Sequence, residues 1–154
     1  MAALKAQRLR VPAFDPEAVA RAEAALEQLS GQFPDWLGEE TARLEAALAD
    51  AQARDYPAEA LFQVYVRAHD VKGLGATCKY PLITQLAASL CRLIQTEERR
   101  ARAARHAALM QAAVAAIRVA LRDGVRDAET AVAQELAAQL QARVAAAVEG
   151  TADG

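Results

Sequence analysis

A histidine, a lysine and a glycine near the middle of the chain are spaced so that all three could act on one reactant. His69 is followed by Lys72 at the third position and by Gly73 at the fourth. In an α-helix these offsets place the three residues on one face, one turn apart. A histidine imidazole is largely neutral at physiological pH, so its ring nitrogen is a nucleophile that needs no activating base. The pattern predicts nucleophilic chemistry at His69, with Lys72 as a point charge for an anionic group and Gly73 as an open approach.

The side chains around this trio are typical of a surface that a second protein contacts. Glycine in a helix interior costs about 1 kcal/mol relative to alanine, so its presence beside His69 needs a reason. A missing side chain there lets another protein approach the ring closely. The same side of the predicted helix carries more apolar and aromatic residues than a solvated face requires, and we predict that they form a docking surface: Phe62, Tyr65, Val66 and Ala76.

The segment that contains the trio is predicted to be a helix on the outside of a bundle. Its inward residues recur at spacings of three and four, which is the seam of a bundle helix: Leu61, Val64, Ala68, Val71, Gly75 and Cys78. His69 points well away from this seam. Gly75 lies on the seam, so we interpret it as a packing glycine.

Helix-breaking residues divide the rest of the chain into further helices. The charged segment 96–106 contains no glycine or proline, so a loop and a continuous helix both fit it. The other signals are a start at Asp15-Pro16-Glu17, a cap at Asp35, starts at Asp55-Tyr56-Pro57 and at Pro81, a stop at Asp123-Gly124, and a last helix over roughly 127–148. We predict an all-α fold, a four-helix up-down bundle with additional N- and C-terminal helices. The expected organisation is a flexible basic arm at 1–14, one bundle domain at 15–148 and a tail at 149–154.

Composition and charge restrict the class of protein. Alanine supplies 41 of the 154 residues and aromatic residues only 5%, which favours helices over sheets. The formal net charge of −2 fits nucleic-acid binding poorly. No apolar run is long enough for a membrane span, and the first residues lack the apolar stretch of a secretory signal. The expectation is a cytoplasmic protein without membrane or nucleic-acid partners.

The other chemically capable residues favour structural roles. His106 lacks a lysine and a glycine at matching offsets, so we interpret it as structural. Cys78 and Cys91 are expected to be small buried hydrophobes. His69, Asp70 and Cys78 form no recognised metal-ligand spacing, so no metal site is predicted. The arginine-rich segment 99–105 favours a solvated face, with contact to an acidic partner as the alternative.

The run Ala68-His69-Asp70-Val71-Lys72-Gly73 resembles the signature of histidine-containing phosphotransfer (HPt) domains. That signature is a histidine followed by lysine at +3, glycine at +4 and small residues at +6 and +7, here Gly75 and Ala76. The segment HDVKGLGAT, followed by YPLI and LAASLCRLI, is particularly similar to the bacterial stand-alone members of this family. The resemblance covers about residues 34–122 in architecture and is sharp over about 61–94. One departure is Lys79, where the family usually has glycine at +10.

The resemblance implies a phosphoryl relay in two-component signalling. His69 would accept a phosphoryl group from an aspartyl phosphate of one receiver domain and pass it to an aspartate of another, with Lys72 stabilising the group and Gly73 giving access. The partners would be receiver domains of response regulators and of hybrid histidine kinases. The receiver would supply Mg²⁺ and the catalytic machinery, so the chain would need no cofactor of its own. It has no ATP-binding kinase module, which leaves its status as an enzyme open, and we expect a monomer.

The alternative is a non-catalytic helical docking or scaffold protein, that is, a degenerate HPt domain that binds signalling partners without phosphotransfer. The departure at Lys79 and the unassigned last helix favour it. An exposed apolar stripe at Val132, Leu136 and Leu140 would support this alternative, whereas burial of the stripe would remove its main support.

Overall fold

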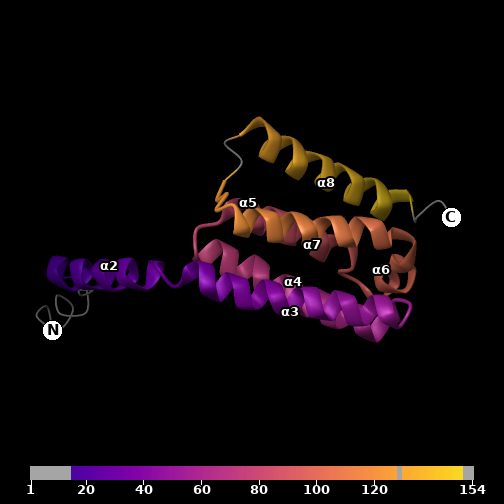
Figure 1. Ribbon diagram of the computed structural model, residues 1–154, viewed down its shortest axis with the longest axis horizontal. Coiled ribbons are helices and arrows are strands. Elements are labelled where there is room, and N and C mark those ends of the chain that lie inside the picture. Colours follow the sequence, from indigo (N-terminus) through magenta and orange to yellow (C-terminus); the bar gives the residue numbers. More distant parts are fainter. Residues whose placement is uncertain (1–14, 128–129, 151–154) are drawn as a thin grey trace, which may run out of the picture. The chain divides into compact units, whose positions relative to one another are not determined.

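The computed structural model describes residues 15–127 and 130–150, and these residues form helices joined by short connections (Figure 1). The helices are α2 (Pro16–Ser30), α3 (Phe33–Ala53), α4 (Ala58–Thr77), α5 (Pro81–Leu93), α6 (Glu97–Arg102), the 3-10 helix η1 (Ala103–His106), α7 (Ala107–Arg122) and α8 (Ala131–Gly150). No strand occurs in the described ranges, so the prediction of an all-α helical bundle is confirmed. In that same part of the chain, no helix combines the length and the apolar character needed to cross a membrane. The predicted arm at 1–14 and residues 151–154 of the predicted tail lie outside the described residues.

The chain divides into two compact units, with the boundary between Phe33 and Pro34. This boundary falls inside the range 15–148 that the sequence predicts as one domain, so α2 is described on its own. The helix begins where the sequence predicts. The Asp15 side chain accepts a hydrogen bond from the backbone N–H of Glu17 at 3.2 Å, and Pro16 opens the helix. None of the α2 residues is buried.

In the second unit, α3, α4, α5 and α7 form the four-helix bundle (Figure 1). Helix α5 packs against both α4 and α7. Side chains join α7 to α3 through Gln111 to Gln52 and Arg118 to Glu45, each at 3.3 Å. The predicted seam of α4 is confirmed, since all six of its residues are buried. The largest fully buried side chains come from all four helices and from Ile94, directly after α5: Leu37, Leu44, Leu48, Leu61, Val64, Val71, Ile83, Leu86, Leu90, Ile94, Met110 and Ile117.

Three of these helices end in the same hydrogen-bonded motif, in which a residue with positive φ turns the chain out of the helix. The backbone N–H that follows this residue donates to a carbonyl five residues earlier, which is the Schellman pattern. The residues with positive φ at this position are Asp55 (60°), Lys79 (63°) and Gly124 (66°), and Tyr56, directly after Asp55, also has a positive φ of 55°. The corresponding bonds are Tyr56 to Ala51 at 2.7 Å, Tyr80 to Gly75 at 2.8 Å and Val125 to Ala120 at 2.8 Å.

Lys79 therefore occupies a backbone conformation that favours glycine. The left-handed region costs a residue with a Cβ atom roughly 1–2 kcal/mol. The lysine at this position, where the resembled family usually has glycine, thus carries a backbone cost. The Lys79 N–H still donates to the Ala76 carbonyl at 3.3 Å.

Three boundaries differ from the sequence-based expectation. Helix α3 begins at Phe33, two residues before the expected cap, because a proline in the first turn loses no helical hydrogen bond. The segment 96–106 is neither an open loop nor one continuous helix but α6 followed by η1, with the Thr96 hydroxyl accepting from the N–H of Arg99 at 3.1 Å. The last helix starts at Ala131, where the Thr130 hydroxyl accepts from the N–H of Ala133 at 3.1 Å, and it runs two residues into the predicted tail.

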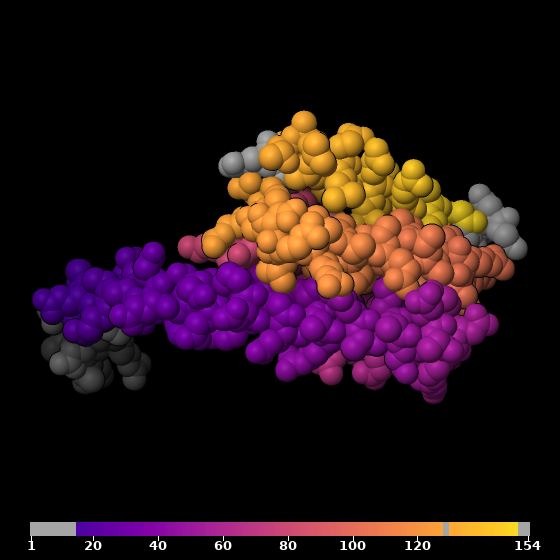
Figure 2. Space-filling view, viewed as in Figure 1, coloured from indigo at the N-terminus to yellow at the C-terminus, as the bar shows by residue number. Residues whose placement is uncertain are grey.

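Helix α8 packs mainly against α5 and has fewer contacts with α7. Figures 1 and 2 show α8, in yellow, on the outside of the bundle. Its buried residues are Ala133, Leu140 and Val144. Val132 and Leu136, in the first and second turns of the helix, are 80% and 43% exposed. The packing of α8 thus covers its α5 side and leaves much of its other side open.

Candidate functional site

His69 lies in the middle of α4 on the outer face of the bundle. Its side chain is exposed, whereas the neighbouring Ala68 and Val71 are fully buried. The helical period of 3.6 residues explains both facts, because the buried seam fixes the rotation of α4 and turns His69 outward. The imidazole is therefore held on a firmly packed helix and remains open to a partner.

Three rings form a row along this face of α4. The ring centroids of Tyr65 and His69 are 6.2 Å apart with an interplanar angle of 42°. Those of Phe62 and Tyr65 are 6.4 Å apart at 29°. These separations lie within the range of favourable aromatic contacts. Phe62 is 46% exposed, so the row presents apolar surface to solvent beside the histidine.

Arg100 of α6 covers the far end of this row. Its guanidinium carbon lies 5.2 Å from the ring centroid of Phe62 and 6.0 Å from that of Tyr65, within the distance of a cation–π contact. The same side chain donates hydrogen bonds to the carbonyls of Ile94 at 3.0 Å and Gln95 at 3.2 Å. The Arg100 guanidinium is thereby held between the aromatic row and the carbonyls that follow α5, and it restrains the row.

The interpretation of 99–105 as a solvated face is therefore wrong at Arg100, which is half-buried. The sequence contains no signal that would single out Arg100 among its neighbours. The stacking depends on the short α6 helix folding back on α4, which no periodicity in this charged segment shows.

Lys72, one turn after His69, is half-buried and lies toward α5. Its backbone carbonyl accepts a hydrogen bond from the Thr84 hydroxyl at 3.3 Å. Its charge acts on Cys91 of α5: burial raises the pKa of the Cys91 thiol to about 11, and the positive charge of Lys72 offsets part of that rise. No hydrogen bond joins the Lys72 ammonium to the His69 ring among the described residues. The cation thus lies at the side of the histidine where α4 meets α5.

The two glycines of this segment have different surroundings. A Cβ atom added at Gly73 would meet no heavy atom within 4 Å. One added at Gly75 would lie 2.7 Å from the Oγ1 atom and 3.3 Å from the backbone nitrogen of Thr84. Gly75 is required for the close approach of α4 and α5, which confirms its predicted packing role. Helix packing does not require Gly73, which leaves an open surface beside His69.

The two remaining docking candidates extend the same side of α4. Val66 is half-buried and Ala76, two turns after His69, is exposed. An exposed ion pair between Arg67 and Asp70 at 4.0 Å borders this surface and contributes little to stability. We call the surface made by Phe62, Tyr65, Val66, His69, Lys72, Gly73 and Ala76, together with Arg100, the His69 face.

The three residues expected to be structural, Cys78, Cys91 and His106, differ in burial and in hydrogen bonding. Cys78 and Cys91 are buried, as predicted, and burial also raises the pKa of the Cys78 thiol. His106 is half-buried where η1 meets α7, and its Nε2 atom is buried without a hydrogen-bond partner. No group of three or more His, Cys, Asp or Glu side chains in the described ranges is placed to hold a metal ion.

The site is thus a nucleophile, a cation and an open backbone patch on one helix, beside restrained aromatic rings. Comparisons of the whole chain with models of protein families, with curated proteins and with solved structures found no match.

Proposed function

We propose that this chain is a cytoplasmic histidine phosphotransfer protein, which relays a phosphoryl group between receiver-domain aspartates through His69. The observation that carries the proposal is the exposed imidazole in the middle of a bundle helix, one turn from a glycine whose surroundings are empty. The resemblance of the segment 68–76 to HPt domains supplies the reaction.

The chemical step requires a nucleophile and an approach from one side. A ring nitrogen of His69 attacks the phosphorus of an aspartyl phosphate with its lone pair, a P–N bond forms, and the P–O bond to the aspartate breaks with that carboxylate leaving. The ring proton stays on the other nitrogen or passes to solvent. The second transfer reverses these steps on a different aspartate. The receiver domain supplies Mg²⁺ for both transfers, and this chain supplies the acceptor.

The other residues of the His69 face have separate parts in this proposal. Lys72 lies beside the nucleophile as a point charge that stabilises the added negative charge. Gly73 leaves room for the edge of the receiver's site. Phe62, Tyr65, Val66 and Ala76 provide apolar area for docking, and Arg100 holds the first two in place and adds a positive charge near the edge.

The test is a phosphotransfer assay with a panel of phosphorylated receiver domains, comparing the wild type with His69→Gln. The proposal predicts an acid-labile, base-stable phosphoryl group on the wild type and none on the variant. Circular dichroism would verify that the variant is folded, which is expected because His69 is exposed. Equal labelling of both proteins, or a folded wild type that no receiver labels, would contradict the proposal.

A second candidate, the docking or scaffold protein without phosphotransfer, is favoured by one observation. Val132 and Leu136 of the predicted stripe are 80% and 43% exposed, although Leu140 is buried at 5%. The stripe is therefore apolar surface over about its first half. This second function would be identified by two results together. The wild type would bind a receiver domain without becoming phosphorylated, and Val132→Asp would abolish that binding.

A further inference from the structure

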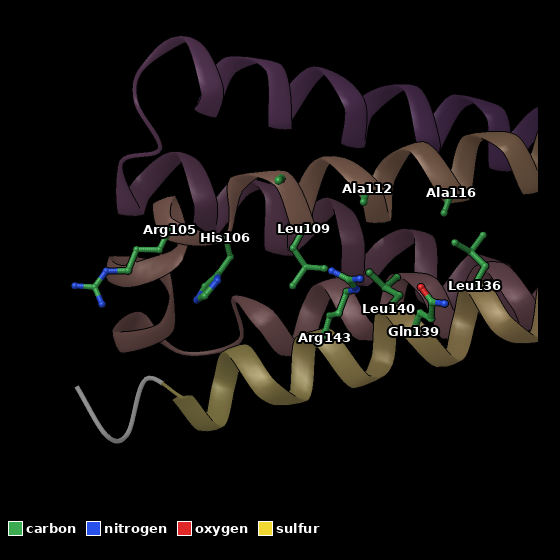
Figure 3. A pocket seen from close by; sticks show the side chains of 10 residues that line it. Arg105, His106, Leu109, Ala112, Ala116, Leu136, Gln139, Leu140 and Arg143 are labelled. Atoms are coloured by element: carbon green, nitrogen blue, oxygen red, sulfur yellow. The ribbon is translucent and has the colours of Figure 1, made fainter.

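A groove of about 420 Å³ runs between α7 and α8, on helices that contribute nothing to the His69 face (Figure 3). Its apolar lining comes from both helices: Ala108, Leu109, Ala112, Ala116, Leu136 and Leu140. The groove forms because α8 packs mainly against α5, and because alanines on α7 leave space where larger side chains would fill it. We call it the α7/α8 groove.

One end of this groove is cationic. Arg143 extends from α8 into the space beside Leu109, as Figure 3 shows. It forms no hydrogen bond or ion pair with any residue in the described ranges. Arg105 also lines this end, although its guanidinium points away from the groove in the same view. No aspartate or glutamate is among the ten residues that line the groove, so the charge of Arg143 has no acidic counterpart there.

His106 adds an unsatisfied polar atom at the same end. Its ring lies between η1 and α8 in Figure 3, and its buried Nε2 atom has no hydrogen-bond partner. A buried polar atom without a partner costs free energy, and a bound ligand that supplies the partner removes that cost. Rotation of the ring about its side-chain bonds would bring Nε2 toward an anion held by Arg143.

The opposite end of the groove is apolar. Leu136 lies there with Ala116, seven residues from Arg143 along α8, which corresponds to about 10 Å of helix. The Glu135 carboxylate nearby accepts a hydrogen bond from the Gln139 side chain at 2.9 Å and so faces a partner of its own helix. The groove therefore has one cationic end and a remainder that is apolar apart from the Gln139 side chain.

We propose that the α7/α8 groove binds an aliphatic monocarboxylate. The carboxylate pairs with the Arg143 guanidinium and, after rotation of the ring, accepts a hydrogen bond from His106, while the alkyl chain lies against Leu109, Leu136 and the alanines of α7. A guanidinium matches the planar carboxylate in geometry as well as in charge. The site is independent of the proposed phosphotransfer.

The test uses the full chain and decanoate as the probe, with calorimetry and backbone NMR as the readouts. We expect saturable binding with a dissociation constant below about 1 mM and shifts confined to η1, α7 and α8. Arg143→Gln should weaken binding about tenfold, because it removes a charge-assisted hydrogen bond. Arg21→Gln, on the exposed helix α2, is the matched control and should leave the affinity unchanged.

Two further comparisons separate a built site from non-specific adsorption. Decyltrimethylammonium has the same chain with the opposite charge and should not bind, and acetate should bind too weakly to detect. Ala112→Phe fills the groove from an exposed position and should abolish decanoate binding; Arg143→Gln keeps the test valid if that variant misfolds. Absence of saturable decanoate binding, equal binding of the cationic amphiphile, or an unchanged affinity in Arg143→Gln would overturn the proposal.

Discussion

The two faces of α4 show how one helix can serve packing and chemistry without conflict. The inner face is buried along its whole length and includes Gly75, where an added Cβ atom would contact Thr84 at 2.7 Å. The outer face carries His69 and Gly73, where an added Cβ atom would contact nothing within 4 Å. Glycine at two positions of one helix therefore has two causes, helix packing at one and open access at the other. Changes on the inner face should affect stability, and changes on the outer face should affect phosphotransfer.

The largest expected effect of a single substitution at these glycines is that of Gly73→Leu on the outer face. A leucine side chain there would push the receiver away from the His69 ring, and a misplacement of about 1 Å costs roughly 100-fold in rate. The phosphotransfer rate should therefore fall about 100-fold, while the free energy of unfolding rises by up to about 1 kcal/mol because glycine is removed from a helix. Rapid-quench phosphotransfer and urea unfolding measure the two quantities. A large loss of stability would break the distinction between the faces.

Gly75→Ala on the inner face should have the opposite signature. Overpacking against Thr84 typically costs 1–3 kcal/mol, so we expect the free energy of unfolding to fall by about 2 kcal/mol, with the phosphotransfer rate per folded molecule unchanged. The double variant Gly75→Ala/Thr84→Ala removes the contacting hydroxyl and should recover part of the loss. Absence of any recovery in urea unfolding would show that Thr84 is not the cause.

Substitution of Arg100 tests whether the outer face needs support from α6. Arg100→Ala removes the cation–π contacts to Phe62 and Tyr65, each worth about 0.5–1 kcal/mol at an exposed site, and with them the restraint on the aromatic row. We expect the KM for a phosphorylated receiver to rise a few-fold, with a loss of stability of about 1 kcal/mol. Arg105→Ala serves as the matched control and should change neither quantity; equal effects of the two substitutions would indicate a general effect of charge.

The smallest expected effect is at the end of α4. Lys79→Gly should raise the free energy of unfolding by about 1 kcal/mol, because the left-handed conformation no longer strains a Cβ atom. This value is net of the opposing effect of glycine, which gives the unfolded chain more conformational entropy. Gly124→Lys, at the equivalent position after α7, should lower stability by a similar amount. Neither substitution should alter phosphotransfer. Opposite shifts of the thermal midpoint in the two variants would support the assigned cost of a side chain at a left-handed helix end. Shifts of the same sign would contradict it.

Local signals in the sequence were sufficient for much of the fold. The alternating spacings of three and four between Leu61 and Cys78 predict the buried seam of α4, and with it the outward position of His69. The pair Asp15-Pro16 predicts the start of α2, and Gly124 the end of α7, because capping depends on neighbouring residues alone.

Features that depend on contacts between distant residues were not predictable. Arg100 reaches Phe62 only because α6 folds back onto α4, and nothing in the charged segment encodes that approach. The stripe on α8 repeats every four residues and so drifts around the helix, which is why Leu140 is buried and Val132 is exposed. The left-handed conformation at the end of α4 was not predictable, because it is usually indicated by glycine and this position is Lys79.

The central claim, that His69 is the phosphoryl acceptor, is tested most directly by comparing the chain's two histidines in one assay. Wild type, His69→Gln and His106→Gln would each be incubated with the same phosphorylated receiver, and the phosphoryl group located by mass spectrometry under basic conditions. The account predicts phosphohistidine at position 69 in the wild type and in His106→Gln, and none in a folded His69→Gln. Labelling of His69→Gln, or loss of labelling in His106→Gln alone, would contradict it.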